Sequence, residues 1–130
     1  MCAHALAALP AECCGLVGGR ASASGEAYES ASVYPLRNTA SNPQMRYSAA
    51  PQELFAAQRQ MRLRGEELIG IYHSHPRDAE PVPSPTDVRL AYYPQVIYFI
   101  VGLRGRRTNL RAFRIYADEG RWEQAAYRVE

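Results

Sequence analysis

An apolar run that ends in two histidines constrains this chain more than any other stretch. Residues 68–72 (Leu-Ile-Gly-Ile-Tyr) are followed directly by His73 and, two positions later, His75. A short apolar run of this kind predicts a β-strand, which Pro76 would end because proline has no N–H for the ladder. Alternate side chains of a strand share a face, so the two imidazoles would lie about 7 Å apart along the strand and could converge on one ion. Imidazole is the commonest metal-binding side chain, but a histidine on a strand is usually a core or surface residue, so the pair alone is ambiguous.

A third candidate ligand follows at a predicted helix start. Ser84 as N-cap and Pro85 at the first helical position predict that a helix begins here, with Asp87 in its first turn. Two histidines and one carboxylate are typical of a catalytic zinc site, which leaves a fourth position for water. Ser84 and Asp87 alone would be better explained by a capping box. Their combination with the histidine pair favours the metal site.

The same residues carry a resemblance to a known family. Residues 73–76 (His-Ser-His-Pro), a spacer of seven residues and residues 84–87 (Ser-Pro-Thr-Asp) resemble the signature of the JAMM (MPN-plus, Mov34) metallopeptidases: His-Ser/Thr-His-Pro, seven residues, Ser-x-x-Asp. Residues 10–18, which include Glu12, resemble the Glu-containing segment that opens the same domain. The chain is similar in size and layout to the compact prokaryotic members. The resemblance implies one zinc ion per chain, held by the two histidines and the aspartate.

Hydrolysis at such a site needs a general base. Spacing leaves three candidates open, because Asp78 and Glu80 lie in the adjacent loop and Glu12 lies 61 residues before His73. The resemblance implies that Glu12 is the base and that Ser84 hydrogen-bonds the oxygen of the tetrahedral intermediate. If so, we expect backbone groups, rather than the Ser84 hydroxyl, to cap the helix.

The resemblance also implies a substrate class. JAMM enzymes cleave the peptide or isopeptide bond after the C-terminal Gly-Gly of a ubiquitin-like or sulfur-carrier protein, for example to release a C-terminal extension or an attached cysteine. An extended Gly-Gly tail can pair with a sheet edge and enter a narrow channel, and residues 37–50 and 77–83 could clamp the partner. Two alternatives stay open: a non-catalytic MPN-type interaction module, and a metal-dependent hydrolase of another amide. The oligomeric state is also open, a dimer included.

Size and composition predict one soluble domain over residues 1–130. Hydrophobic residues make up 47% of the chain and charged residues 22%, as in globular proteins. Neither a signal peptide nor an apolar run long enough to span a membrane is found in the sequence, which favours the cytoplasm. Cys2, Cys13 and Cys14 fit neither a disulfide framework nor a zinc ribbon, and we expect them to be small apolar residues in a reducing compartment.

Charge gives little indication of a partner. The net charge is +2, and Arg104, Arg106 and Arg107 are interpreted as a solvated turn, so no nucleic-acid partner is expected. His4 is likewise interpreted as a surface or packing residue. All fifteen basic residues are arginine, so no side-chain amine could accept a ubiquitin-like modifier.

The predicted fold class is α/β (α+β), one curved mixed sheet covered by about three helices. The resemblance implies the same architecture, a cytidine-deaminase-like JAMM fold. In the helix predicted over 51–64, Leu54, Phe55 and Met61 recur at helical spacing. The strand predicted over 96–101 should be central and buried, since it is continuously apolar. Helices are predicted at 2–9, 51–64 and 85–92, and strands at 13–19, 26–36, 68–75, 96–101, 110–116 and 122–129.

Overall fold

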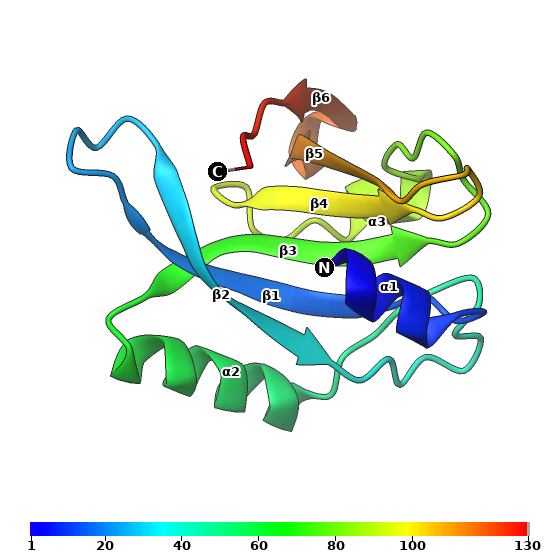
Figure 1. Ribbon diagram of the computed structural model, residues 1–130, viewed down its shortest axis with the longest axis horizontal. Coiled ribbons are helices and arrows are strands. Elements are labelled where there is room, and N and C mark those ends of the chain that lie inside the picture. Colours follow the sequence, from blue (N-terminus) through cyan, green and yellow to red (C-terminus); the bar gives the residue numbers. More distant parts are fainter. Residues whose placement is uncertain (130) are drawn as a thin grey trace.

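A six-stranded mixed sheet forms the centre of the molecule in the computed structural model, which describes residues 1–129 (Figure 1). Its order is β2-β1-β3-β4-β5-β6, and all neighbours are antiparallel except β3 and β4. The predicted fold class is therefore confirmed. Glu130, the last residue of the predicted domain, lies outside the described residues. The strands are β1 Cys14–Ala21, β2 Tyr28–Leu36, β3 Glu67–His75, β4 Ile97–Gly102, β5 Asn109–Tyr116 and β6 Arg121–Ala125.

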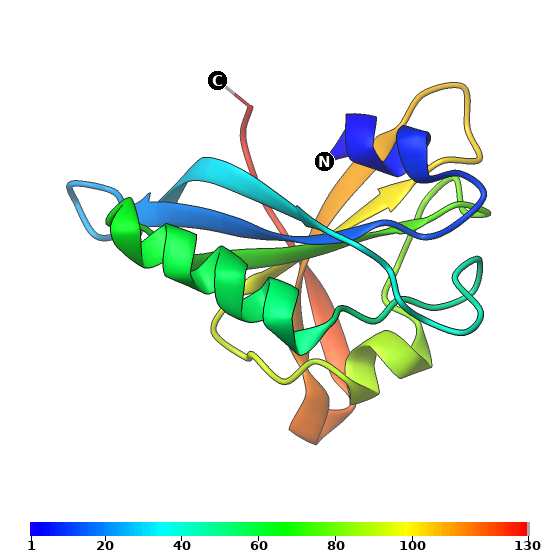
Figure 2. The same ribbon diagram turned by 90° about the horizontal axis from the view of Figure 1, so that it is seen from below.

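Helices cover both faces of this sheet. They are α1 (Cys2–Ala8), α2 (Pro51–Leu63) and α3 (Pro85–Arg89), with a short 3-10 turn η1 (Ala117–Glu119) before β6. Figure 2 shows α1 on one face and α2 and α3 on the opposite face. Among residues 1–129, no helix has the length and apolar character needed to cross a membrane.

Strand alternation divides the core between the two faces. Cys13 belongs to the cluster beneath α1, whereas Cys14 belongs to the cluster beneath α2. Both thiols are free and buried, as expected, while Cys2 is only half-buried. Tyr72 also faces α1 and accompanies Cys13, so its neighbour His73 faces the side of α2 and α3.

Several predicted elements differ from the structure at their ends, and the differences are largest in α3 and β6. In α2 the buried residues are Ala57 and Met61, whereas Phe55 is 72% exposed, so helical spacing predicted the helix but did not identify its buried face. Helix α3 ends before residue 92 because Ala91 packs into the core and the Tyr93 N–H donates to the Tyr98 hydroxyl.

Strand β6 ends at Ala125 rather than at residue 129. Beyond it the chain leaves the ladder, and Tyr127 packs edge-on against Phe99 while its hydroxyl donates to the Leu110 carbonyl. The side-chain contacts of Tyr127 thus replace the backbone pairing predicted here.

The fold brings several distant segments to one end of the sheet. Strand β1 begins where β3 ends, with Cys14 paired to His73. The loops at residues 37–50 and 77–83 lie at that same end (Figure 1). Residues far apart in the sequence are therefore assembled around the C-terminal end of β3.

Candidate metal centre

The three predicted ligands converge. His73 Nε2 and His75 Nε2 lie 3.1 Å apart, His75 Nε2 lies 3.0 Å from Asp87 Oδ2, and His73 Nε2 lies 3.2 Å from the same oxygen. His73 is 1% exposed, and the side chains of His75 and Asp87 are each 12% exposed. Strand β3 supplies the two imidazoles from one face, and the first turn of α3 supplies the carboxylate.

This triangle has the dimensions of a tetrahedral metal site. Zinc bonds to nitrogen and oxygen of about 2.0–2.1 Å would place two tetrahedral ligand atoms about 3.3 Å apart. The three observed separations of 3.0–3.2 Å are close to that edge. Each residue offers one ligand atom to the group. The residues present therefore fit a zinc ion bound by three protein ligands.

Electrostatics keep the carboxylate of this group ionised. Burial alone would raise the pKa of Asp87, but hydrogen bonds from His73 and His75 outweigh burial and hold this pKa well below its usual range. For His75, burial lowers the pKa, while the hydrogen bond and charge of Asp87 outweigh that effect and raise it. Because a metal ligand must be neutral imidazole, metal binding would compete with a proton at His75.

Asp78 orients one of the two histidines. Its Oδ2 lies 2.9 Å from His75 Nδ1, on the side of the ring away from Asp87. A carboxylate at this nitrogen favours the tautomer that leaves Nε2 free to bind a metal. The candidate base Asp78 is thus engaged with the outer nitrogen of a ligand, and Glu80, the other candidate in that loop, is exposed.

Tyr47 supports the other histidine by stacking. Its ring lies over the His73 ring at 4.6 Å between centroids, with 26° between the planes. Within residues 1–129, His73 Nδ1 is buried and has no hydrogen-bond partner. Apart from the contacts with Asp87, His73 is therefore supported by ring stacking, whereas His75 is supported by the Asp78 carboxylate.

Ser84 caps α3 with its own hydroxyl. Its Oγ accepts from the Asp87 N–H at 3.0 Å, and Asp87 Oδ2 accepts from the Ser84 N–H at 2.9 Å, which completes a capping box. The expectation that backbone groups would replace this hydroxyl was wrong. Capping uses only the acceptor side of Oγ, so the O–H proton can still be donated to another group.

Glu12 lies beside the three converging residues. It immediately precedes β1 and is 8% exposed. Because Cys14 pairs with His73 and residues alternate, Glu12 lies on the same face as the histidines. Burial raises the pKa of Glu12 to about 7, while His75 opposes and Asp87 and Asp78 reinforce this shift. A carboxyl group with such a pKa is suited to exchanging protons at neutral pH.

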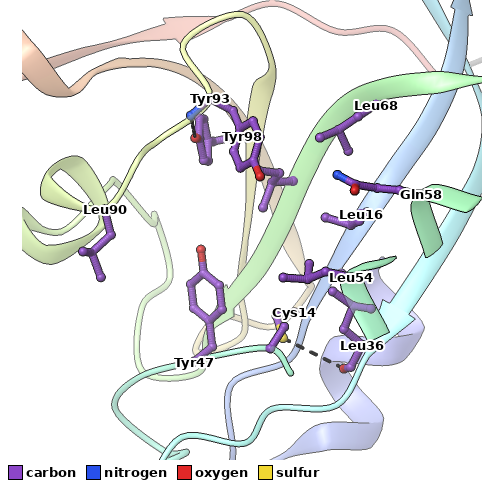
Figure 3. A pocket seen from close by; sticks show the side chains of 13 residues that line it. Cys14, Leu16, Leu36, Tyr47, Leu54, Gln58, Leu68, Leu90, Tyr93 and Tyr98 are labelled. Carbon is purple, nitrogen blue, oxygen red and sulfur yellow. Dashed lines mark hydrogen bonds between the residues drawn. The ribbon is translucent and has the colours of Figure 1, made fainter. Parts of the chain in front are cut away.

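An apolar pocket adjoins this group behind Tyr47 (Figure 3). Its cavity volume is about 160 Å³. Leu54 and Gln58 of α2 line one side and Tyr93 and Tyr98 another, while the Tyr47 hydroxyl points into the space between them. Tyr47 thus separates the pocket from His73.

The structure brings together all five residues singled out from the sequence: His73, His75 and Asp87, with Glu12 and Ser84 beside them. His4 lies on the opposite face, where its Nδ1 is 2.8 Å from the Tyr72 hydroxyl. Sequence reasoning missed the contacts of Asp78 and Tyr47. The i,i+3 spacing of His75 and Asp78 could have indicated the contact between these two side chains. No local pattern in the sequence indicates that Tyr47 stacks on His73.

The sequence matches a known protein family and two known relatives. The family described as prokaryotic homologs of the JAB domain matches residues 1–116. A desampylase of Haloferax volcanii is 34% identical over 99 residues, which cover 76% of this chain and 68% of the relative. A Thermus thermophilus protein named "Probable TtuB-protein conjugate cleaving protease" is 37% identical over 108 residues, covering 83% of this chain and 67% of the relative.

Solved structures show the same architecture. The solution structure of a protein from Desulfitobacterium hafniense superimposes with a TM-score of 0.79 at 36% identity, covering 96% of this chain and 82% of the other. A second solution structure, of a protein from Salinibacter ruber, gives a TM-score of 0.69 at 26% identity, covering 96% and 81%.

Proposed function

This chain belongs to the family of prokaryotic homologs of the JAB domain, and on that premise we propose that it is a zinc-dependent peptidase or isopeptidase. Its proposed substrate is a ubiquitin-like or sulfur-carrier protein, cleaved after the C-terminal Gly-Gly. The observation that carries the proposal is the convergence of His73, His75 and Asp87 to 3.0–3.2 Å beside Glu12. The names of the two curated relatives agree with it, since one is named desampylase and the other "Probable TtuB-protein conjugate cleaving protease".

His73 and His75 through Nε2, and Asp87 through Oδ2, would hold the zinc ion. When bound, the ion supplies Lewis-acid chemistry and lowers the pKa of a coordinated water to about 7. Asp78 keeps the His75 ring oriented, and the stacked Tyr47 ring keeps His73 in place.

Glu12 then acts as the base. Its carboxylate takes a proton from the attacking water as the oxygen bonds to the substrate carbonyl carbon. The same carboxyl group gives that proton to the amine nitrogen as the carbon–nitrogen bond breaks, so the products are a carboxylic acid and a free amine. A pKa of about 7 suits both halves of this transfer. The Ser84 hydroxyl, whose proton is not used in capping, donates to the oxygen of the tetrahedral intermediate.

The surroundings of the site fit an extended, largely apolar tail. The pocket behind Tyr47 is lined mainly by apolar side chains such as Leu54 and Leu90, which suits an aliphatic residue upstream of the scissile bond. Glycines next to that bond would let the tail approach the closely packed His75 and Asp87 without steric conflict.

The direct test is incubation of the zinc-loaded protein with a Gly-Gly-tailed carrier. One substrate would carry a C-terminal extension, and another an isopeptide-linked lysine peptide. Mass spectrometry should show a product that ends at Gly-Gly, and a chelator should abolish its formation. The enzyme contains no lysine, so every isopeptide bond cleaved must belong to the added conjugate.

Two results would contradict the proposal. Cleavage that persists in chelator would exclude the metal mechanism. A purified protein that binds no zinc and cleaves neither substrate would favour the non-catalytic interaction module instead.

A further inference from the structure

The Glu12 carboxylate depends on its backbone for position. Among residues 1–129, no backbone or side-chain group donates a hydrogen bond to this carboxylate, although the residue is only 8% exposed. The backbone N–H and carbonyl of Glu12 are, in contrast, both engaged. The Glu12 N–H donates to the Pro43 carbonyl at 2.7 Å, and the Glu12 carbonyl accepts from Asn38 Nδ2 at 3.0 Å.

Ser74 holds the N–H side of the peptide between Glu12 and Cys13. Its Oγ accepts from the Cys13 N–H at 2.8 Å, and its own N–H donates to the Cys13 carbonyl at 3.2 Å. Ser74 is 0% exposed and lies between the two histidines, but its side chain faces α1 rather than the metal centre. This hydroxyl therefore links Cys13, the residue after Glu12, by a hydrogen bond to the strand that carries His73 and His75.

Asn38 holds the loop that flanks Glu12. Its Nδ2 also donates to the carbonyls of Pro43 at 3.3 Å and Arg46 at 2.8 Å. Its Oδ1 accepts from two further backbone N–H groups of the loop, those of residues 40 and 48. One side chain thus ties the loop to itself and to Glu12, and the same loop carries Tyr47, which stacks on His73.

We propose that Ser74 and Asn38 are positioning residues that set the Glu12 carboxylate against the three ligand side chains. The inference rests on the proposed role of Glu12 as base. Neither residue touches the reacting atoms, since both act on peptide groups. Displacing a catalytic group by about 1 Å can cost about 100-fold in rate, so loosening either contact should reduce turnover while zinc stays bound.

Four variants test this. Ser74→Ala removes the acceptor of the Cys13 N–H, whereas Ser74→Thr keeps a hydroxyl on a strand residue and should restore function. Asn38→Asp keeps the acceptor oxygen but replaces the donor amide by a group that cannot donate to Glu12. The matched control is Thr39→Val, which removes the bond from Thr39 Oγ1 to the Ser48 carbonyl in the same loop without touching Glu12.

We expect Ser74→Ala and Asn38→Asp to lower kcat about 10- to 100-fold with KM and zinc content unchanged. Ser74→Thr and Thr39→Val should stay within about threefold of wild type. In the Glu12→Gln background, Ser74→Ala should have no further effect, because the residue through which it acts has already been lost. Equal losses from Ser74→Ala in both backgrounds, or a loss of zinc that parallels the loss of kcat, would overturn the proposal.

A second readout needs no substrate. In the zinc-loaded protein, amide hydrogen exchange at residues 12–14 should be about tenfold faster in Ser74→Ala and Asn38→Asp than in Thr39→Val. Unchanged exchange there would contradict the proposal whatever the activity. If the wild-type protein cleaves no Gly-Gly conjugate, the proposed function fails while exchange still reports whether these residues hold Glu12.

Discussion

The two halves of the candidate site are built in opposite ways. The ligand segment, residues 73–87, supplies all three predicted ligands from one strand end and one helix start. The base segment, Glu12 and Cys13 with the loop at residues 37–50, lies far away in the sequence and reaches the site through pairing with β3 and through hydrogen bonds from Asn38 and Ser74. Side-chain contacts fix the ligands, whereas backbone contacts fix the base.

This difference predicts which property each half controls. Changes to the three candidate ligands, or to Asp78 and Tyr47, which contact them, should alter metal binding first and cleavage as a consequence. Changes to Glu12, or to Ser74 and Asn38, which hold its backbone, should alter cleavage while the metal stays bound. The predictions below test that separation, from the largest expected effect to the smallest.

Replacing Asp87 by alanine should have the largest effect. It removes the oxygen that both histidines face and also one half of the α3 capping box. We expect no bound zinc by elemental analysis, cleavage reduced to the level of chelated protein, and a stability loss of about 1–2 kcal/mol in urea titration. A variant that still binds one zinc per chain would place the metal elsewhere.

Glu12→Gln should separate the two halves most clearly. The amide is nearly isosteric but cannot take a proton, so kcat should fall about 100- to 10,000-fold while zinc content stays at one per chain. Exposed Glu80 provides the matched control, because Glu80→Gln should leave both quantities unchanged. Full activity in the Glu12 variant would transfer the base role to another group.

Asp78→Ala should weaken zinc binding and leave Glu12 unaffected. Without its carboxylate at Nδ1, His75 loses the contact that fixes its tautomer, and zinc affinity should fall about 10- to 100-fold. Competition with a chromophoric chelator measures this affinity. Because Glu12 is untouched, added zinc should restore cleavage, and failure of that rescue would give Asp78 a direct part in the reaction.

The pH dependence of cleavage should be set by Glu12. Burial raises the pKa of Glu12 to about 7, and only the ionised carboxylate can accept the proton of the attacking water. kcat/KM should therefore rise as pH rises through about 7 and fall about tenfold per unit well below that value. The residual kcat/KM of Glu12→Gln should not fall in this way below pH 7. The same fall in the variant would show that another group, not Glu12, is titrating.

Tyr47 should give the smallest effect. Its ring supports His73 by stacking, so Tyr47→Ala should weaken zinc binding about 3- to 10-fold. Tyr47→Phe keeps the ring and should bind zinc as the wild type does. Equal losses in both variants, measured by the same chelator competition, would show that the hydroxyl rather than the ring matters.

The same contrast explains how much could be predicted from the sequence. The three candidate ligands were recognisable because strand alternation and an N-cap fix the directions of His73, His75 and Asp87 locally. The family resemblance was needed for Glu12, since no spacing rule connects it to β3. Capping by the Ser84 hydroxyl was missed because this hydroxyl was treated as either a cap or a donor, although an O–H group can accept and donate at once.

Other features depend on packing and have no sequence period. Phe55 has the spacing of a buried helix residue, yet α2 turns Ala57 and Met61 toward the sheet instead. Tyr127 follows a strand-like run, but its ring contact with Phe99 takes the chain out of the ladder. Tertiary contacts determine where Phe55 and Tyr127 lie, as they determine the contacts of Asn38 and Tyr47.

The most direct test of the account is anomalous X-ray diffraction at the zinc edge from crystals of the zinc-loaded protein. The account predicts one peak per chain, about 2.0–2.1 Å from His73 Nε2, His75 Nε2 and Asp87 Oδ2, with Glu12 beside it but not bound to it. A peak at another place, or one with Glu12 as a fourth ligand, would contradict the separation of ligands from base.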